Sequence, residues 1–333
     1  MKKLNIVYFC LSLSAFLLAG CSSGNKKPRR TDTPTSGVAR IVVDECLAPI
    51  IQQQIDVFEG TFPEATIIPI YTSEKEAFQI LQDDSVRLLV GTRKLSDTEY
   101  QTIAQRRQRI MTQRLAVDGV ALIVNKENTD TLITVENIKK IMTGEIRSWK
   151  ELDANSRLGD ITVVFDSPNS STAKFISDSI IDKQPFGAGI KAMATDSVRS
   201  ESIKNMTPNQ MVVNYVEQNA NALGVVGVNW ISNPSDTTGL SFSPKINVMS
   251  ISSGEKVGGK LAYYKPFPAF LGMKFYPLSR DVYIIITESQ GGLPSGFVNF
   301  AAGEKGQRIV FKSGLFPATI PTRMVSVKPM SEL

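Results

Sequence analysis

The sequence predicts an α/β protein built of two layered lobes, and three observations lead to this prediction. Strand-like and helix-like segments alternate through residues 41–125, and the alternation starts again at Val135 and continues to Gly314. The chain has 333 residues and is 42% hydrophobic, which is enough for one large or two medium domains with real cores. Two lobes, each with its own sheet, fit this length better than one sheet of a dozen strands.

The first half of the chain supplies seven predicted elements in strict alternation. Branched apolar runs predict strands at residues 39–45, 65–71, 86–92 and 119–125. Apolar residues at helical spacing predict helices at residues 49–60, 74–85 and 96–110. Such alternation is typical of a largely parallel sheet with helices on its faces.

The second half repeats this plan. Helices are predicted at residues 135–142, 171–181 and 207–219, with a helix or helix pair at 295–313. Strands are predicted at residues 161–165, 223–231 and 276–287.

Three loops follow predicted strands and are candidate ligand loops, at residues 44–47, 91–94 and 166–172. Ligands of open α/β sheets bind beyond the carboxyl ends of the strands. Each loop combines charged or hydroxyl side chains with backbone amides at the start of a predicted helix. The alternative for any one of them is a polar cap on that helix.

The N-terminus predicts export and lipid anchoring. Residues 1–20 have two lysines, an apolar run too short to span a bilayer, and a small-residue cleavage site, as in a signal peptide. The ending Leu-Ala-Gly-Cys matches the bacterial lipoprotein box, which predicts lipidation of Cys21; an ordinary secretory signal is the alternative. Residues 21–37 are polar and rich in Ser, Pro and Gly, as in a flexible tether. We therefore expect a membrane-anchored lipoprotein on the periplasmic side of the cell envelope.

Charge and reactive residues exclude several classes of function. Residues 1–40 hold seven of the 37 Lys and Arg and one of the 32 Asp and Glu, so the remainder is near neutral with 30 basic and 31 acidic residues. The basic pI is therefore no argument for nucleic-acid binding, and a basic tether suits anionic headgroups better. Cys10 leaves with the signal peptide, so Cys46 is the single free cysteine, and no disulfide or thiolate metal site is expected. The absence of histidine excludes His-based catalysis and most zinc and copper sites.

Several segments resemble the periplasmic phosphate-binding proteins of ABC transporters. The resemblance runs through LAVDGVALIVNKEN, ITVENIKKIMTGEIRSWKEL, NALGVVGVNWI, FYPLSRDVYIIIT and GEKGQRIVFKSGLFPA, and it covers about residues 40–320. It implies a two-lobed type II periplasmic-binding-protein fold that closes on a small ligand. Lobe 1 would be residues 38–117 with 283–325, and lobe 2 would be residues 118–282.

The resemblance also implies a function. Such a protein captures inorganic phosphate in the inter-lobe cleft and delivers it to an ABC permease as a monomer, without cofactor, metal or catalysis. The matching positions are Glu45 and Cys46 in the first loop, Thr92 and Arg93 in the second, and Asp166, Ser170, Ser171 and Thr172 in the third.

The charged positions depart from the family pattern. Asp166 stands where the family commonly has a phosphate-pairing Arg, Arg93 stands near its acidic position, and the first loop carries Asp44 and Glu45. One account is a swapped pair, in which Arg93 neutralises the ligand while Asp166 accepts a hydrogen bond from a protonated ligand oxygen. The other is that the pocket binds another solute, or binds weakly. The same fold would then serve as a sensor or accessory lipoprotein for a different small solute.

Other residues admit two interpretations. Cys46 is either a reactive thiol or, as we prefer, a small packing residue or hydroxyl substitute. Asp118 either reaches ligand or caps a turn, and for Arg280 we favour a structural ion pair over a place in the cleft. An enzymatic alternative would need a pair such as Ser170 and Lys174, for which helical spacing is the only support.

Overall fold

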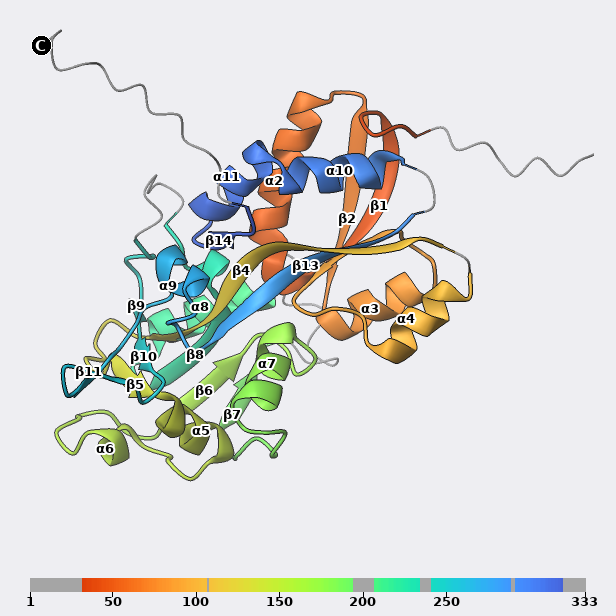
Figure 1. The fold of residues 1–333 in the computed structure, drawn as a ribbon. Helices are drawn as coiled ribbons and strands as arrows, with labels where there is room; N and C mark the ends of the chain where they lie inside the picture. The colour runs from red at the N-terminus through yellow and green to blue at the C-terminus, as the bar shows by residue number, and fades with distance from the viewer. Residues whose placement is uncertain (1–31, 107, 194–206, 234–240, 289–290, 320–333) are drawn as a thin grey trace, which may run out of the picture. The chain divides into compact units, whose positions relative to one another are not determined.

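The computed structural model describes residues 32–106, 108–193, 207–233, 241–288 and 291–319 (Figure 1). The helices are α2 (Ala48–Thr61), α3 (Glu74–Gln82), α4 (Asp97–Ala104), α5 (Val135–Thr143), α6 (Trp149–Leu152), α7 (Ser171–Ser179), α8 (Pro208–Gln218), α9 (Pro268–Gly272), α10 (Leu293–Ala302) and α11 (Glu304–Lys312), with 3-10 turns η1 (Glu45–Leu47) and η2 (Val228–Trp230). The strands are β1 (Gly37–Asp44), β2 (Ala65–Thr72), β3 (Leu88–Gly91), β4 (Ile110–Val124), β5 (Leu132–Thr134), β6 (Thr162–Phe165), β7 (Ile190–Ala192), β8 (Ala222–Gly227), β9 (Asn247–Val248), β10 (Ser250–Ser252), β11 (Lys256–Val257), β12 (Lys260–Leu261), β13 (Ser279–Thr287) and β14 (Phe316–Pro317).

The main sheet has the order β2-β1-β3-β13-β4-β8-β6-β7, with β9 and β14 also paired to β4. The strands at its two ends pair in parallel, as predicted: β1 with β2 and β3, and β6 with β7 and β8. Two sheets were predicted, one in each lobe. Instead, β4 hydrogen-bonds to strands on both sides, and this joins the two halves into one ladder.

The long strands β4 and β13 run side by side through the middle of the sheet (Figure 1). Their antiparallel register pairs Thr287 with Ile110 at one end and Ser279 with Gly119 at the other, with an irregularity between Val282 and Tyr283. The predicted helix at residues 96–110 ends at Ala104, and Ile110 already belongs to β4. Pairing with β13 therefore decides the conformation of a segment whose own pattern is ambiguous.

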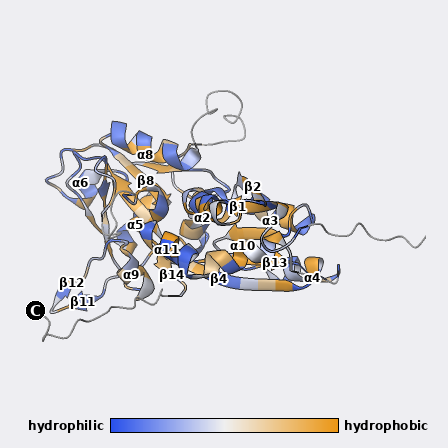
Figure 2. Ribbon diagram, turned by 90° about the horizontal axis from the view of Figure 1, so that it is seen from above, coloured by the Kyte–Doolittle hydropathy of each residue, from blue (hydrophilic) through white to orange (hydrophobic). Residues whose placement is uncertain are grey.

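Four clusters of buried apolar side chains form the core, and they divide along the chain. Two clusters draw on residues 39–116 and 282–315, and two draw on residues 117–278. Hydrophobic residues colour much of β8, β13 and α10 in Figure 2, as expected for elements with few faces toward water. The division supports two lobes, while the exact boundaries at 117/118 and 282/283 stay a prediction.

Predicted and observed helices agree closely elsewhere. Residues 49–60 were predicted as a helix and α2 spans Ala48–Thr61, while the predicted helix or pair at 295–313 is the pair α10 and α11. The predicted signal peptide and Cys21 lie outside the described residues, as does most of the tether. Among the described residues, no helix is both long and apolar enough to cross a membrane.

Candidate functional site

The loop after β1 and the loop after β6 meet where the two lobes join. Asp44 begins η1 because its Oδ1 accepts the Cys46 N–H at 3.2 Å. Ser170 begins α7 because its Oγ accepts the Ala173 N–H at 3.1 Å. Both are ordinary helix-capping arrangements. They bring Cys46, two residues after its cap, and Ser171, directly after its cap, to the junction.

Cys46 connects the two loops directly. Its Sγ donates to Asp44 Oδ2 at 3.1 Å and accepts from Ser171 Oγ, also at 3.1 Å. The sulfur also accepts a hydrogen bond from Arg280 Nη2 at 3.3 Å. The thiol therefore takes the place of a hydroxyl in a hydrogen-bond chain, as preferred from the sequence. Burial raises the pKa of Cys46, so the protonated form is favoured.

Arg280 is the cation of this cluster. It lies on β13 opposite Asp118 on β4, and its Nε donates to Asp118 Oδ2 at 3.0 Å. Its Nη1 also donates to Ser171 Oγ at 3.2 Å, from where the chain continues to Cys46. Arg280 is 5% exposed and Asp118 is fully buried. The structural ion pair that we favoured is present, and the same guanidinium also reaches two predicted site residues.

Asp166 is held within its own loop. Thr172 Oγ1 lies 2.9 Å from both of its carboxylate oxygens, and the Ser167 N–H donates to Oδ1 at 2.9 Å. Ser170 Oγ lies 3.0 Å from Thr172 Oγ1. Burial raises the pKa of Asp166, although hydrogen bonds from Ser170, Ser167 and Thr172 oppose this.

Two more buried carboxyl groups complete the cluster. Burial, together with the nearby Glu74 carboxylate, raises the pKa of Asp44 to about 7, against the opposing effect of Arg280. Burial also raises the pKa of Asp118, again against Arg280. Three carboxyl groups thus surround one guanidinium, and each is more easily protonated than usual. We name this set the junction cluster: Asp44, Cys46, Asp118, Asp166, Ser170, Ser171, Thr172 and Arg280.

Thr92 and Arg93 contact Glu74 and Glu99 rather than the carboxyl groups of the junction cluster. Thr92 donates its N–H and its Oγ1 hydrogen to Glu74 Oε1, at 3.0 and 2.7 Å. Arg93 forms a two-pronged pair with Glu99, at 2.7 and 2.8 Å, and its guanidinium lies 3.4 Å from the centre of the Phe78 ring. Among the described residues, no hydrogen bond or ion pair joins Arg93 to Asp166, so the swapped charge pair stays a prediction.

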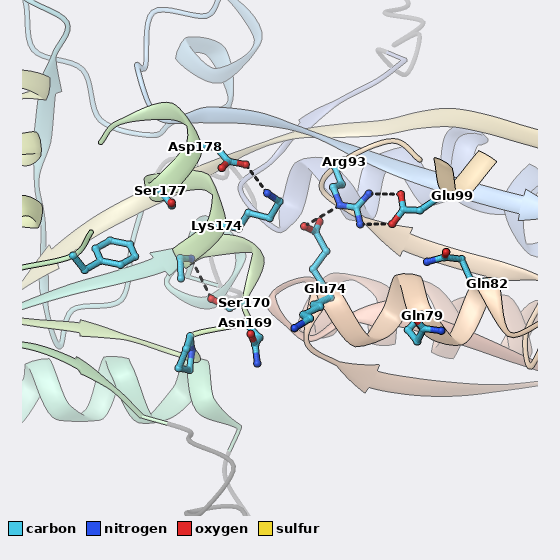
Figure 3. Close-up of a pocket in the computed structure, with 14 residues that line it drawn as sticks. Glu74, Gln79, Gln82, Arg93, Glu99, Asn169, Ser170, Lys174, Ser177 and Asp178 are labelled. Atoms are coloured by element: carbon cyan, nitrogen blue, oxygen red, sulfur yellow. Dashed lines mark hydrogen bonds and ion pairs between the residues drawn. The ribbon is translucent and has the colours of Figure 1, made fainter. Parts of the chain in front are cut away.

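A polar groove of about 490 Å³ separates Arg93 from the α7 side (Figure 3). Glu74, Arg93 and Glu99 line one wall, and Ser170 and Lys174 line the other. The groove is wide enough for a small solute. Glu45, the remaining predicted residue, is buried in the first turn of η1.

The enzymatic alternative finds no support in this geometry. Lys174 Nζ bonds Asp178 Oδ2 at 2.6 Å, one turn further along α7, and Ser170 Oγ is engaged with Ala173 N–H and Thr172. Within the described ranges, no group of three or more His, Cys, Asp or Glu side chains is placed to hold a metal ion.

Two contributions were missed from the sequence. Glu74 organises the Thr92 loop; its position at the start of a predicted helix was readable, but its partner was not. Asn229 Nδ2 and Trp230 Nε1 both donate to the Cys46 carbonyl, at 2.9 and 2.8 Å. Trp230 is partly buried and packs against one of the core clusters. Neither donor carried a signal in the sequence.

Comparisons with known proteins identify the family and the fold of the chain. The family model described as PBP superfamily domain matches residues 28–305. The phosphate-binding protein PstS of Staphylococcus haemolyticus is 25% identical over 317 residues, which cover 92% of this chain and 90% of that protein. PstS of Staphylococcus aureus (strain USA300) is 25% identical over 314 residues, which cover 92% of this chain and 86% of that protein.

Solved structures show the same fold. A putative phosphate ABC transporter substrate-binding protein from Clostridium perfringens, with bound phosphate, aligns with a TM-score of 0.66 at 19% identity and covers 85% of this chain and 100% of that chain. An ABC-type phosphate transport receptor from Vibrio cholerae aligns with a TM-score of 0.59 at 18% identity, and the alignment covers 84% of this chain and 100% of that chain. The two-lobed α/β fold expected from the sequence is confirmed.

Proposed function

Because the chain belongs to the PBP superfamily, we propose that it is a lipid-anchored solute-binding protein of an ABC-type importer that binds inorganic phosphate between its lobes. The observation that carries this proposal is the meeting of Ser170, Ser171 and Thr172 with Arg280 at the lobe junction. The relatives named for phosphate binding match over nearly the whole chain, which supports the same ligand class.

The start of α7 supplies the neutral contacts for an anion. The first backbone amides of a helix have no acceptor within the helix, and the helix dipole favours negative charge there. The hydroxyl groups of Ser170, Ser171 and Thr172 surround this end of α7 and are buried. A phosphate oxygen placed there would receive several hydrogen bonds without any lysine.

Arg280 supplies the charge in this proposal. A guanidinium matches phosphate geometry, and Arg280 already points at Ser171 from the neighbouring strand β13. Arg93 and Thr92 remain predicted contacts from the groove wall. Asp166 accepts a hydrogen bond from a protonated phosphate oxygen, which sulfate cannot offer; Glu45 and Cys46 complete the set on the other lobe.

Entry of phosphate requires the lobes to separate. Cys46, Ser171 and Arg280 are buried and bonded to one another, so a solute must replace the Cys46–Ser171 contact. The binding free energy is therefore the gain from the anion contacts less the cost of breaking this contact.

A second candidate is a different small solute that carries a cationic group. The three buried carboxyl groups of the junction cluster favour it, because they outnumber the single guanidinium. In this case the protein would act as a sensor or accessory lipoprotein on the same fold.

The remaining parts of the proposal concern location and partners. The protein would be held at the membrane through Cys21, on the periplasmic side of the cell envelope. It would work as a monomer, without enzymatic activity or a cofactor, and would deliver its solute to an ABC permease.

Calorimetric titration of the mature chain, residues 21–333 with Cys21→Ser, tests the proposal. Phosphate is titrated with sulfate as the competitor anion, into the parent and into Arg280→Gln, Arg93→Gln and Asp166→Asn. The matched control is Arg114→Gln, because Arg114 lies on β4 in a surface ion pair with Asp281 at 3.8 Å.

We expect micromolar or tighter phosphate binding, which is about 8 kcal/mol or more. Arg280→Gln should abolish it, Arg114→Gln should leave it unchanged, and Asp166→Asn should weaken the preference over sulfate. If the parent unfolds cooperatively but gives no binding heat with phosphate or with sulfate, the phosphate proposal is contradicted. The second candidate would then be tested with cationic and zwitterionic solutes.

A further inference from the structure

The β11–β12 hairpin exposes apolar side chains without a covering partner in the described chain. Val257 is 61% exposed and Leu261 is 38% exposed. Gly258 and Gly259 form the tip at φ values of 60° and 81°, which suit a two-residue hairpin turn. The hairpin lies at the margin of the fold in both ribbon views (Figures 1 and 2).

Further exposed apolar residues follow the hairpin in sequence. Met273 is 53% exposed and Phe275 is 45% exposed. The Phe275 ring stacks on Tyr264, with centroids 5.4 Å apart, and Tyr264 lies three residues after β12. Four of the twelve large apolar side chains exposed in the described chain thus fall between residues 257 and 275.

Lysines are interleaved with the apolar residues of the hairpin. Lys256 pairs with Leu261 across the strands, and Val257 pairs with Lys260. Because paired residues point to the same face, each face of the hairpin carries one apolar and one cationic side chain. Within the described part of the chain, neither Lys256 nor Lys260 has an ion-pair or hydrogen-bond partner, so both ammonium groups are available to an external anion.

We propose that this hairpin tip, residues 256–261, docks onto the surface of an anionic lipid bilayer. Apolar side chains enter the boundary between headgroups and acyl chains, while lysines extend their stems there and keep their charge among the phosphates. Juxtamembrane lysines gain affinity from the negative surface potential. Because both sides of the hairpin are alike, the tip would enter the bilayer rather than one flat face.

A bilayer fits this surface better than a protein partner does. A stable protein interface buries roughly 800 Å² on each side, with a packed apolar core, and a six-residue tip is too small for that. Reversible binding to a bilayer has no such minimum area, because its strength scales with the apolar area buried plus the attraction of cationic side chains to anionic lipids. The inference is independent of the solute between the lobes and would orient the lobes at the membrane.

Vesicle co-sedimentation tests the proposal with the mature chain, residues 21–333. Cys21→Ser removes the acyl chains, and replacing Lys26, Lys27, Arg29 and Arg30 with Gln removes the positive charge of the tether. The probes are vesicles of phosphatidylcholine alone and of phosphatidylcholine with 30 mol% phosphatidylglycerol. The test variants are Lys256→Gln/Lys260→Gln and Val257→Ser/Leu261→Ser. The matched control is Lys305→Gln/Lys312→Gln, which neutralises two exposed lysines of α11.

The protein should sediment with the anionic vesicles and should stay in the supernatant when the vesicles are neutral. Neutralising Lys256 and Lys260 should weaken partitioning about 30-fold, since each lysine near the surface contributes about 1 kcal/mol. The Val257/Leu261 variant should also weaken it, while the α11 control stays within about twofold.

Either of two results overturns the proposal: no binding to anionic vesicles, or equal loss in the α11 control, which would indicate general charge attraction. Thermal unfolding midpoints confirm that all variants are folded, which is expected because the substituted side chains of the hairpin and of α11 are all exposed.

Discussion

At the scale of single residues, Arg280 and Asp118 form a buried ion pair within the junction cluster. Both groups are buried, and Arg280 also satisfies Ser171 and Cys46. Arg280→Gln leaves the Asp118 carboxylate buried without its cation, so we expect the free energy of unfolding to fall by about 3–5 kcal/mol.

Adding Asp118→Asn tests this cause. In the double variant no charge is left unpaired, so part of the loss should be recovered, and urea unfolding of the four proteins gives the coupling energy. Additive losses would contradict a direct interaction between these two groups.

Asp44 makes stability depend on pH. Its pKa is raised from 3.8 to about 7, first by burial and then by Glu74. The folded state therefore holds a proton that the unfolded state releases near pH 4. Stability from this group is fully present below pH 4 and is lost as the pH rises to about 7.

The measurement is the urea midpoint between pH 5 and pH 8, which should fall less in Asp44→Asn than in the parent. Asn retains an Oδ1 to accept the Cys46 N–H, so the helix cap is preserved. Parallel pH profiles would show that Asp44 does not hold the extra proton.

Some of the site could be predicted from residues alone, and some could not. Ser170, Ser171 and Thr172 follow a buried strand and precede a helix, and local sequence is enough to place them there. Arg93 could not be placed in this way. Ser96 and Glu99 form a readable capping box, yet nothing in that motif shows that Glu99 also holds the Arg93 guanidinium.

At the scale of elements, close packing between α8 and the sheet depends on Gly224. A Cβ at Gly224 would lie 2.6 Å from Val216 Cγ2, 2.8 Å from Ile123 Cγ1 and 3.0 Å from Val212 Cγ1. Gly224→Ala should therefore destabilise the protein by about 1–3 kcal/mol through overpacking.

Gly60 in α2 is the matched control for this substitution. A Cβ there has no neighbour within 4 Å, so Gly60→Ala should be neutral or stabilise by up to about 1 kcal/mol. Thermal or urea unfolding measures both variants. Similar effects in the two would show that steric contact with α8 is not the cause.

The elements also show where pattern-based prediction ends. Helices α2, α3 and α5 carry their own periodicity and caps, so their positions were predictable to within a few residues. The first third of β4 was not, because residues 110–114 are mostly exposed and polar. Their strand conformation comes from pairing with β13, about 170 positions away in the sequence.

At the scale of the whole molecule, direct hydrogen bonds hold the loop after β1 against the second lobe. Asn229 and Trp230 bond the Cys46 carbonyl, and Ser171 bonds its thiol. The two-lobed frame followed from the sequence because its α/β alternation restarts midway. This closed junction did not follow, because it depends on contacts between residues up to 234 positions apart.

Cys46 offers a direct measurement of lobe separation. In the mature Cys21→Ser chain it is the single thiol, it is fully buried, and burial raises its pKa. Alkylation by iodoacetamide at pH 8 should therefore be slow in the native protein and fast in urea, because the thiol reacts after the lobes have opened. Arg280→Gln removes one of the contacts at the junction and should increase the native rate.

Phosphate should slow this alkylation if it binds between closed lobes. The open population falls by the factor 1 + [L]/Kd, so a phosphate concentration of ten times Kd should slow labelling about 11-fold. Sulfate at the same concentration is the control. A rate unchanged by saturating phosphate, in a chain that binds phosphate by calorimetry, would place the anion outside the closed junction. The polar groove beside Arg93 would then be the place to look for it.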